Sequence, residues 1–170
     1  MEVRPIQRTD DVRGVLRVNA LAWRTAYDGL LPDAVLARQD PDPTDEQVRD
    51  RAAALRGDRA LVLVADDGRV RGYSHFRWGP ETKSFVGESE AGLTAIYVAP
   101  DCWGEGVATA LLERGLEGLP ASIDRVRLEA LEGNDVGRRF YEARGFDRAG
   151  TSEFEIAGEA YPTAIYTLEV

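Results

Sequence analysis

Two periodicities divide the chain into helices and strands. Apolar positions three or four residues apart predict helices, and short runs rich in β-branched residues predict strands. We expect strands over 3–8, 60–65, 70–78, 93–98, 125–131, 147–156 and 160–169. We expect helices that start near Thr9-Asp10, Pro32, Thr44, Val107 and Asn134, with Val12, Val15, Leu16 and Trp23 on the apolar side of the first. A chain of 170 residues with this pattern is expected to form a single domain over residues 1–170.

Charge and residue counts restrict the function. The net charge of −9 disfavours a nucleic-acid partner, which requires a basic face. The same acidity suits attraction of a cationic amine, or it serves solubility alone. With one cysteine, Cys102, and one histidine, the chain has no internal disulfide, and we expect no metal site. No apolar run approaches the ~20 residues of a membrane span, so we expect a cytoplasmic protein with no membrane partner.

The most informative segment is the apolar strand 93–98 followed by a glycine turn and a helix. Pro100 cannot donate to a strand ladder and so ends the strand, and Gly104 and Gly106 bracket the turn. A glycine turn that opens a helix leaves backbone N–H groups unpaired, and with the helix dipole these groups bind phosphate. The alternative is an ordinary strand–turn–helix joint, in which the glycines only relieve strain.

Two familiar phosphate loops fit this segment poorly. A Walker loop requires Gly-Lys-Ser/Thr, and the only lysine of the chain is Lys83. A dinucleotide fingerprint requires a third glycine, and Thr109 occupies that position.

The segment resembles the pyrophosphate loop of the GNAT superfamily of acetyl-CoA-dependent N-acetyltransferases. That loop is Gln/Arg-x-x-Gly-x-Gly/Ala after a strand ending in Val-x-Pro. Here Tyr97-Val-Ala-Pro100 precedes Trp103-Gly-Glu-Gly-Val-Ala108, so the loop departs from the family at Trp103. A second motif agrees with the resemblance: strand 125–131, Asn134 as helix N-cap, Tyr141 seven residues later, and Gly145-Phe146. The stretch from Ala22 to Asp33 is also similar to a bacterial branch of the family.

This resemblance implies an α+β fold with a mixed, mostly antiparallel central sheet flanked by helices in three layers. Its element order is β-α-α-β-β-β-α-β-α-β-β, and two central parallel strands splay apart to admit the cofactor. It also implies acetyl transfer from acetyl-CoA to an amine by direct attack in a ternary complex. The residues that would hold acetyl-CoA are Ile96, Tyr97, Val98, Trp103, Gly104, Glu105, Gly106, Val107, Ala108, Thr109, Asn134 and Tyr141.

Two residues are candidates for proton transfer. Tyr141 would protonate the departing thiolate, because a phenol with an ordinary pKa near 10 keeps its proton at neutral pH. We expect Val136, Phe140 and Ala143 to form the buried stripe of this helix, which leaves Tyr141 about 100° away from Phe140. Alternatively, Tyr141 is a core residue.

The general base has several candidates. Glu129 stands five residues before Asn134, where some relatives that acetylate protein N-termini carry a catalytic glutamate. It is equally a solvated or ion-paired strand residue. Glu88, Glu90, His75 and water remain open as alternatives, although a lone strand histidine is more often structural.

The acceptor side is expected to include Trp23, Tyr27, Trp78 and Phe85, with Trp23 more typical of core packing. The acceptor itself is a primary amine of a small molecule or a peptide, and its identity cannot be derived from the sequence. The alternative function is a non-catalytic acyl-CoA-binding or sensing domain of the same fold. The closing strands resemble those that pair between subunits in relatives, which is consistent with a homodimer.

Overall fold

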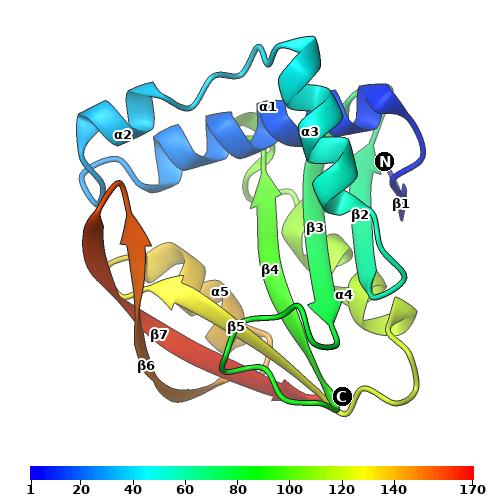
Figure 1. Cartoon of the computed structure of the whole chain (residues 1–170), viewed down its shortest axis with the longest axis vertical. Helices are drawn as coiled ribbons and strands as arrows, with labels where there is room; N and C mark the ends of the chain where they lie inside the picture. Colours follow the sequence, from blue (N-terminus) through cyan, green and yellow to red (C-terminus); the bar gives the residue numbers. More distant parts are fainter. The chain divides into compact units, whose positions relative to one another are not determined.

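The computed structural model describes residues 1–170, and its strands and α-helices are labelled in Figure 1. The strands are β1 (Glu2–Pro5), β2 (Ala60–Asp66), β3 (Val70–Trp78), β4 (Glu90–Val98), β5 (Arg125–Leu131), β6 (Asp147–Ile156) and β7 (Glu159–Glu169). The helices are α1 (Thr9–Ala26), α2 (Asp33–Ala37), α3 (Asp45–Leu55), the 3₁₀ turn η1 (Pro100–Cys102), α4 (Val107–Gly118) and α5 (Asp135–Ala143). Three helices therefore precede β2, one more than in the implied element order, and the additional helix is α2, directly after Pro32. No helix combines the length and the apolar character that a membrane span requires.

The strands form a seven-stranded sheet in the order β1-β2-β3-β4-β5-β7-β6. The pairs β1–β2, β2–β3, β5–β7 and β6–β7 are antiparallel, whereas β4–β5 is parallel. The mixed, mostly antiparallel sheet is therefore confirmed. The parallel ladder joins only Glu90–Gly92 to Arg125–Arg127, while β5 pairs with β7 along its whole length.

The chain forms two compact units. Unit 1 comprises Met1–Arg77 and Ala95–Leu119, and unit 2 comprises Trp78–Thr94 and Pro120–Val170. Because β4 crosses from one to the other, its first half belongs to unit 2 and its second half to unit 1.

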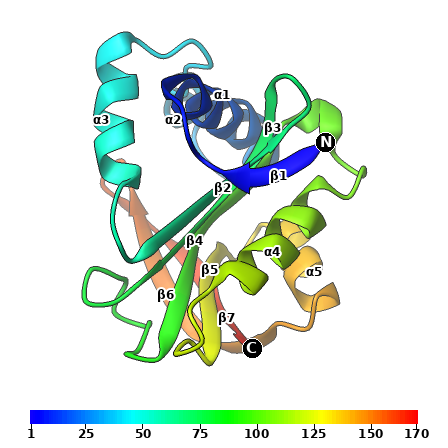
Figure 2. The same ribbon diagram turned by 90° about the vertical axis from the view of Figure 1, so that its right-hand side faces the viewer.

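Unit 1 has a hydrophobic core on each side of β2, as expected for a strand whose side chains alternate between faces. Val62 and Val64 pack with apolar residues of α1 and α3, whereas Leu63 and Ala65 pack with Val107 and Leu111 of α4. Figure 2 shows α1 and α3 on one side of β1 and β2 and α4 on the other.

The start of α1 differs from the expected Thr9-Asp10 cap, because the N-cap is Arg8. The Asp11 carboxylate accepts from the backbone N–H groups of Gln7 and Arg8 at 3.0 and 3.1 Å. It also accepts two bonds from the Arg4 guanidinium, at 2.8 and 2.9 Å. Arg4 reaches Asp66 as well, at 2.8 Å. Asp11 therefore caps the helix from its third position and ties it to β1 and β2.

Unit 2 consists of the β5–β7–β6 ribbon, α5, the start of β4 and the loop between β3 and β4 (Figure 1). Tyr166 of β7 is fully buried, and its hydroxyl donates to Glu142 at 2.7 Å and accepts from Arg138 Nε at 3.2 Å. These two bonds fasten α5 to the sheet. β6 is exposed along nearly its whole length.

Candidate active site

The glycine turn after β4 has the backbone that phosphate binding requires. Gly104 and Gly106 both have φ of +81°, and a Cβ built on either glycine would meet no atom within 4 Å. Side chains with a Cβ are strained at this φ, so glycine is needed for the turn itself. The open space beside both glycines leaves room for a group that approaches the backbone closely.

The helix that follows presents unpaired amides to this turn. α4 begins at Val107 with Gly106 as N-cap, has no side-chain cap and carries no acid in its first turn. The first N–H groups of a helix have no intrahelical acceptor, and the helix dipole favours an anion there. The turn and helix therefore fit a pyrophosphate. The exposed Glu105 adds one negative charge to the rim.

Trp103 is tied back to the strand that precedes it. Its side chain is 45% exposed, and Nε1 donates to the Val98 carbonyl at 2.8 Å. The indole therefore occupies the backbone acceptor of Val98, one of the residues predicted to hold acetyl-CoA. Where the family usually has Gln or Arg, this chain thus has a tryptophan whose hydrogen bond holds the loop against the end of β4.

Two of the predicted acceptor-side residues, Trp23 and Tyr27, lie close to Tyr97 of β4 within unit 1. The hydroxyls of Tyr27 and Tyr97 lie 3.0 Å apart, and burial raises the pKa of Tyr97. The Trp23 ring contacts Tyr27 edge to face, with ring centroids 5.1 Å apart. Because Tyr27 is buried and Trp23 is half-buried, both residues contribute packing between α1 and β4.

The second motif has the predicted caps. Asn134 Oδ1 accepts from the Gly137 N–H at 3.1 Å, and Gly145 has φ of +93° just after the end of α5. The predicted buried stripe is wrong, because no residue of α5 is buried and Val136 is 75% exposed. Spacing fixes the angle of a side chain around the helix but not which face the rest of the protein covers, and Val136 lies on an uncovered face.

Tyr141 belongs to an aromatic cluster of unit 2. Its ring centroid lies 5.7 Å from that of Phe146, 6.2 Å from that of Tyr166 and 5.5 Å from that of Phe140. The side chain remains half-buried. The ring is thus fixed by packing, which is compatible both with the core role and with a positioned phenol.

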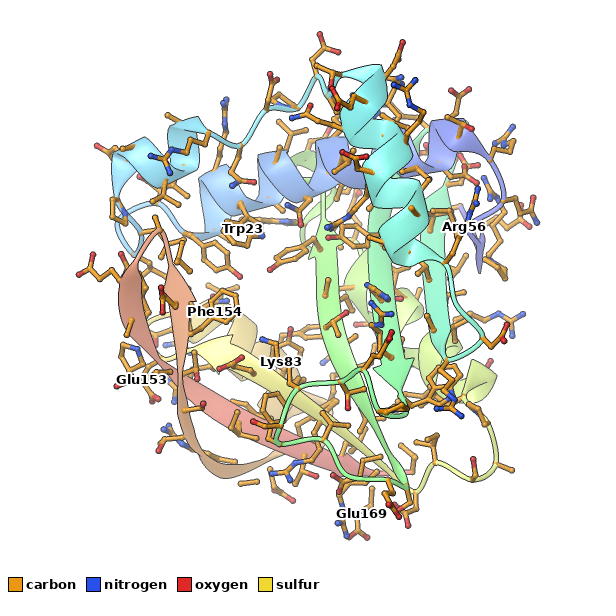
Figure 3. The ribbon with its side chains drawn as sticks, viewed as in Figure 1. Trp23, Arg56, Lys83, Glu153, Phe154 and Glu169 are labelled. Atoms are coloured by element: carbon orange, nitrogen blue, oxygen red, sulfur yellow. The ribbon has the colours of Figure 1, made fainter.

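Glu129 is engaged by two side chains of unit 2. Its Oε1 lies 2.6 Å from Lys83 Nζ, and its Oε2 accepts from Thr163 Oγ1 at 2.8 Å. The ammonium of Lys83 also lies 4.4 Å from the centroid of the Phe154 ring, and Figure 3 shows these two side chains near each other. The side chain of Glu129 is only 8% exposed, so Lys83 neutralises a nearly buried carboxylate. We call Glu129, Thr163 and Phe154 the ammonium cluster.

The other candidates for the base differ in their environments. Glu90 is buried, accepts from the Gly87 N–H at 2.8 Å and pairs with Arg125 at 3.2 Å. Glu88 is exposed. Burial, with the nearby charges of Arg77 and Arg51, lowers the pKa of His75 to about 4, so the imidazole is neutral at pH 7.

The remaining acceptor candidates lie in unit 2. Trp78 ends β3, and Phe85 lies in the following loop, where its carbonyl accepts from Arg127 Nη1 at 2.9 Å. Sequence reasoning did not single out Lys83 and Thr163, which contact Glu129, or Phe154, which contacts Lys83. The one available signal was that Lys83 is the sole lysine in a chain with many arginines.

Comparison with known proteins shows to which family the chain belongs. Residues 22–146 match the model of the acetyltransferase (GNAT) family. YuaI, an uncharacterized N-acetyltransferase of Bacillus subtilis, is 29% identical over 157 residues, which cover 89% of this chain and 83% of that protein.

Solved structures share the fold at low sequence identity. The PaiA N-acetyltransferase of Thermoplasma acidophilum, determined in complex with coenzyme A, has a TM-score of 0.70 at 16% identity, with 99% of this chain and 98% of that chain covered. The ribosomal-protein-S18-alanine N-acetyltransferase of Escherichia coli has a TM-score of 0.68 at 19% identity, with 99% and 92% covered. The chain therefore belongs to the GNAT family of acetyltransferases and is an N-acetyltransferase.

Proposed function

We propose that this enzyme transfers the acetyl group of acetyl-CoA directly to a primary amine of a small molecule or peptide. The observation that carries the proposal is the glycine turn, in which Gly104 and Gly106 leave open space before the uncapped start of α4. The N–H groups from Gly104 to Ala108 would hold the pyrophosphate. Acetyl-CoA supplies the activated acetyl group as a thioester.

Direct transfer is supported by the state of the only thiol. Cys102 is buried, and burial together with Asp101 raises its pKa. Because the thiolate is the nucleophilic form, this cysteine is poorly suited to carry an acetyl group. The acceptor amine is then the nucleophile itself.

We assign the proton transfers to residues of unit 2. Glu129 would take a proton from the acceptor ammonium, and the resulting amine forms the C–N bond. Tyr141 would donate its proton to the thiolate as the C–S bond breaks, and the second proton that the nitrogen loses on becoming an amide would return to the Tyr141 phenolate. In unit 1, a backbone N–H near Tyr97 and Val98 would stabilise the negative charge that develops on the carbonyl oxygen.

The ammonium cluster indicates what kind of acceptor fits. The Lys83 ammonium lies 2.6 Å from the carboxylate of Glu129 and 4.4 Å from the centroid of the Phe154 ring. Carboxylates and ring faces both attract alkylammonium groups. We therefore propose that an acceptor alkylammonium takes the place of Lys83 against Glu129. The chain's own lysine is then a competitor that the acceptor displaces.

Release of free thiol from acetyl-CoA tests this function. Primary alkylamines, diamines and a peptide with a free N-terminus are compared with the N,N-dimethylated form of each. Turnover with primary amines alone supports the proposal. Binding of acetyl-CoA without thiol release on any primary amine contradicts it, and an acetyl group on Cys102 in the intact-protein mass spectrum contradicts direct transfer. A homodimer and the absence of a nucleic-acid partner remain predictions.

A further inference from the structure

Unit 1 contains a second candidate binding site, whose lining includes no residue of the glycine turn 104–106. It is a pocket of about 410 Å³ lined by residues of α1, of the β2–β3 turn and β3, and of the segment that follows β4. The lining includes Arg17, Arg24, Arg69 and Arg71, with Leu21, Ala99 and Pro100 as an apolar part. Four arginines around one pocket are unexpected in a chain with a net charge of −9.

The protein compensates this positive charge only in part. Asp101 is the one carboxylate of the lining, and it lies 3.7 Å from Arg71, which also pairs with Asp67 at 2.9 Å. The side chains of Arg24 and Arg69 form no ion pair or hydrogen bond with the protein, and both residues are exposed. The pocket therefore holds two arginines whose donors are available to a ligand.

Of the four arginines that line the pocket, Arg17 has the least favourable environment. Its Nη2 donates to the Val70 carbonyl, but its Nε is buried without a hydrogen-bond partner. Burial and the charges of Arg69 and Arg71 lower its pKa. The repulsion between these guanidiniums is costly, and an anion bound in the pocket would relieve it.

We propose that this pocket binds a small molecule bearing a phosphate group. The guanidinium is a planar fork of donors that matches phosphate oxygens in pairs, and Arg17, Arg24 and Arg69 offer such donors from two sides. The apolar residues Leu21, Ala99 and Pro100 would contact the uncharged part of the ligand. Because the segment 99–101 directly precedes the glycine turn, a ligand here would contact the base of the cofactor loop. The inference does not depend on the identity of the acceptor amine.

Calorimetric titration with pyrophosphate tests the proposal, using free protein and protein saturated with acetyl-CoA. The variant is Arg24→Ala/Arg69→Ala, since neither side chain supports the fold. Arg59→Ala, an exposed arginine of the same unit, is the matched control. In free protein the glycine turn is expected to bind pyrophosphate as well, so the affinities are compared in protein saturated with acetyl-CoA. There we expect pyrophosphate to bind and the double variant to lose about tenfold or more in affinity, as two charge-assisted contacts are removed. Arg59→Ala should bind as the wild type does.

The two sources of phosphate give different results. If pyrophosphate competes with acetyl-CoA and the double variant weakens both, the pocket binds a phosphate of the cofactor. If pyrophosphate binds beside acetyl-CoA and only its own affinity falls, the pocket binds a separate phosphorylated ligand. Equal pyrophosphate affinity in the wild type and the double variant overturns the proposal, because the anion then binds elsewhere.

Discussion

The ammonium of Lys83 lies 2.6 Å from the carboxylate of Glu129. The only lysine of the chain is therefore paired with the residue proposed as the general base. We expect Lys83→Met to lower the KM for the acceptor amine severalfold, because the methionine keeps the apolar stem and removes the competing charge. The side chain of Lys83 is 44% exposed and that of Glu129 is 8% exposed, so the substitution leaves a nearly buried carboxylate without its ion-pair partner and is expected to lower stability as well. Steady-state kinetics with a primary amine measures the effect.

Thr163→Val separates this competition from a general disturbance of Glu129. It removes the 2.8 Å hydrogen bond to Oε2 but leaves Lys83 in place, so the KM for the amine should not fall. An unchanged or higher KM in Lys83→Met would show that Lys83 does not compete with the acceptor.

Tyr141→Phe should reduce kcat about 100-fold, because the proton donor to the departing thiolate is lost. The KM for acetyl-CoA should change little, since the ring that packs on Phe146 and Tyr166 is retained. Tyr161→Phe, which removes another hydroxyl of unit 2, is the control. A fully active Tyr141→Phe enzyme would assign protonation to water or to another group.

Asp11→Asn should destabilise the protein by about 3 kcal/mol, because it leaves the Arg4 guanidinium poorly paired in a buried network. The Asp11 side chain is 2% exposed, whereas the control Asp45 is 83% exposed in its pair with Arg13. Asp45→Asn should cost less than about 1 kcal/mol. Urea denaturation measures both, and equal effects would contradict the structural role of Asp11.

Asp11 also contributes to the acid sensitivity of the fold. The hydrogen bonds from Arg4 hold the pKa of Asp11 well below its usual range. A lowered carboxyl pKa stabilises the fold above the unfolded pKa near 4, and this stability is lost as the pH falls below that value.

His75 makes the stability of the fold depend on pH in a higher pH range than Asp11 does. Its pKa is about 4 in the fold, because burial disfavours the charged ring, against about 6.5 when unfolded. The unfolded chain therefore binds the extra proton, and stability falls by up to about 3 kcal/mol as the pH drops from 6.5 to 4. The imidazole NMR signal of this single histidine should titrate near pH 4. A midpoint near 6.5 would show that the ring is not buried.

Local patterns predicted the elements whose signals lie within a few residues. β6 has the predicted bounds, Asn134 caps α5, and Thr44 and Gln47 exchange the two bonds of a capping box. In each case the deciding preference is local, an alternation of side chains or a capping geometry.

Features that depend on distant partners were not predictable in this way. Glu90–Gly92 are poor strand formers, but they extend β4 because they pair with residues of β5 far along the chain. The stripe on α5 was assigned from spacing alone, although the ribbon beneath does not cover Val136. The pair of Lys83 and Glu129 joins positions 46 residues apart, which only the folded chain brings together.

The central claim is that the turn at Gly104 and Gly106 binds the pyrophosphate of acetyl-CoA. Calorimetric titration of acetyl-CoA into the wild type, Gly106→Trp and Gly158→Trp tests it most directly, with ATP and NAD as controls. Both glycines have φ of +81° and open space around a built Cβ, so the two variants carry the same backbone strain. The account predicts selective binding of acetyl-CoA that is abolished in folded Gly106→Trp and retained in Gly158→Trp. Unchanged affinity in Gly106→Trp would contradict it.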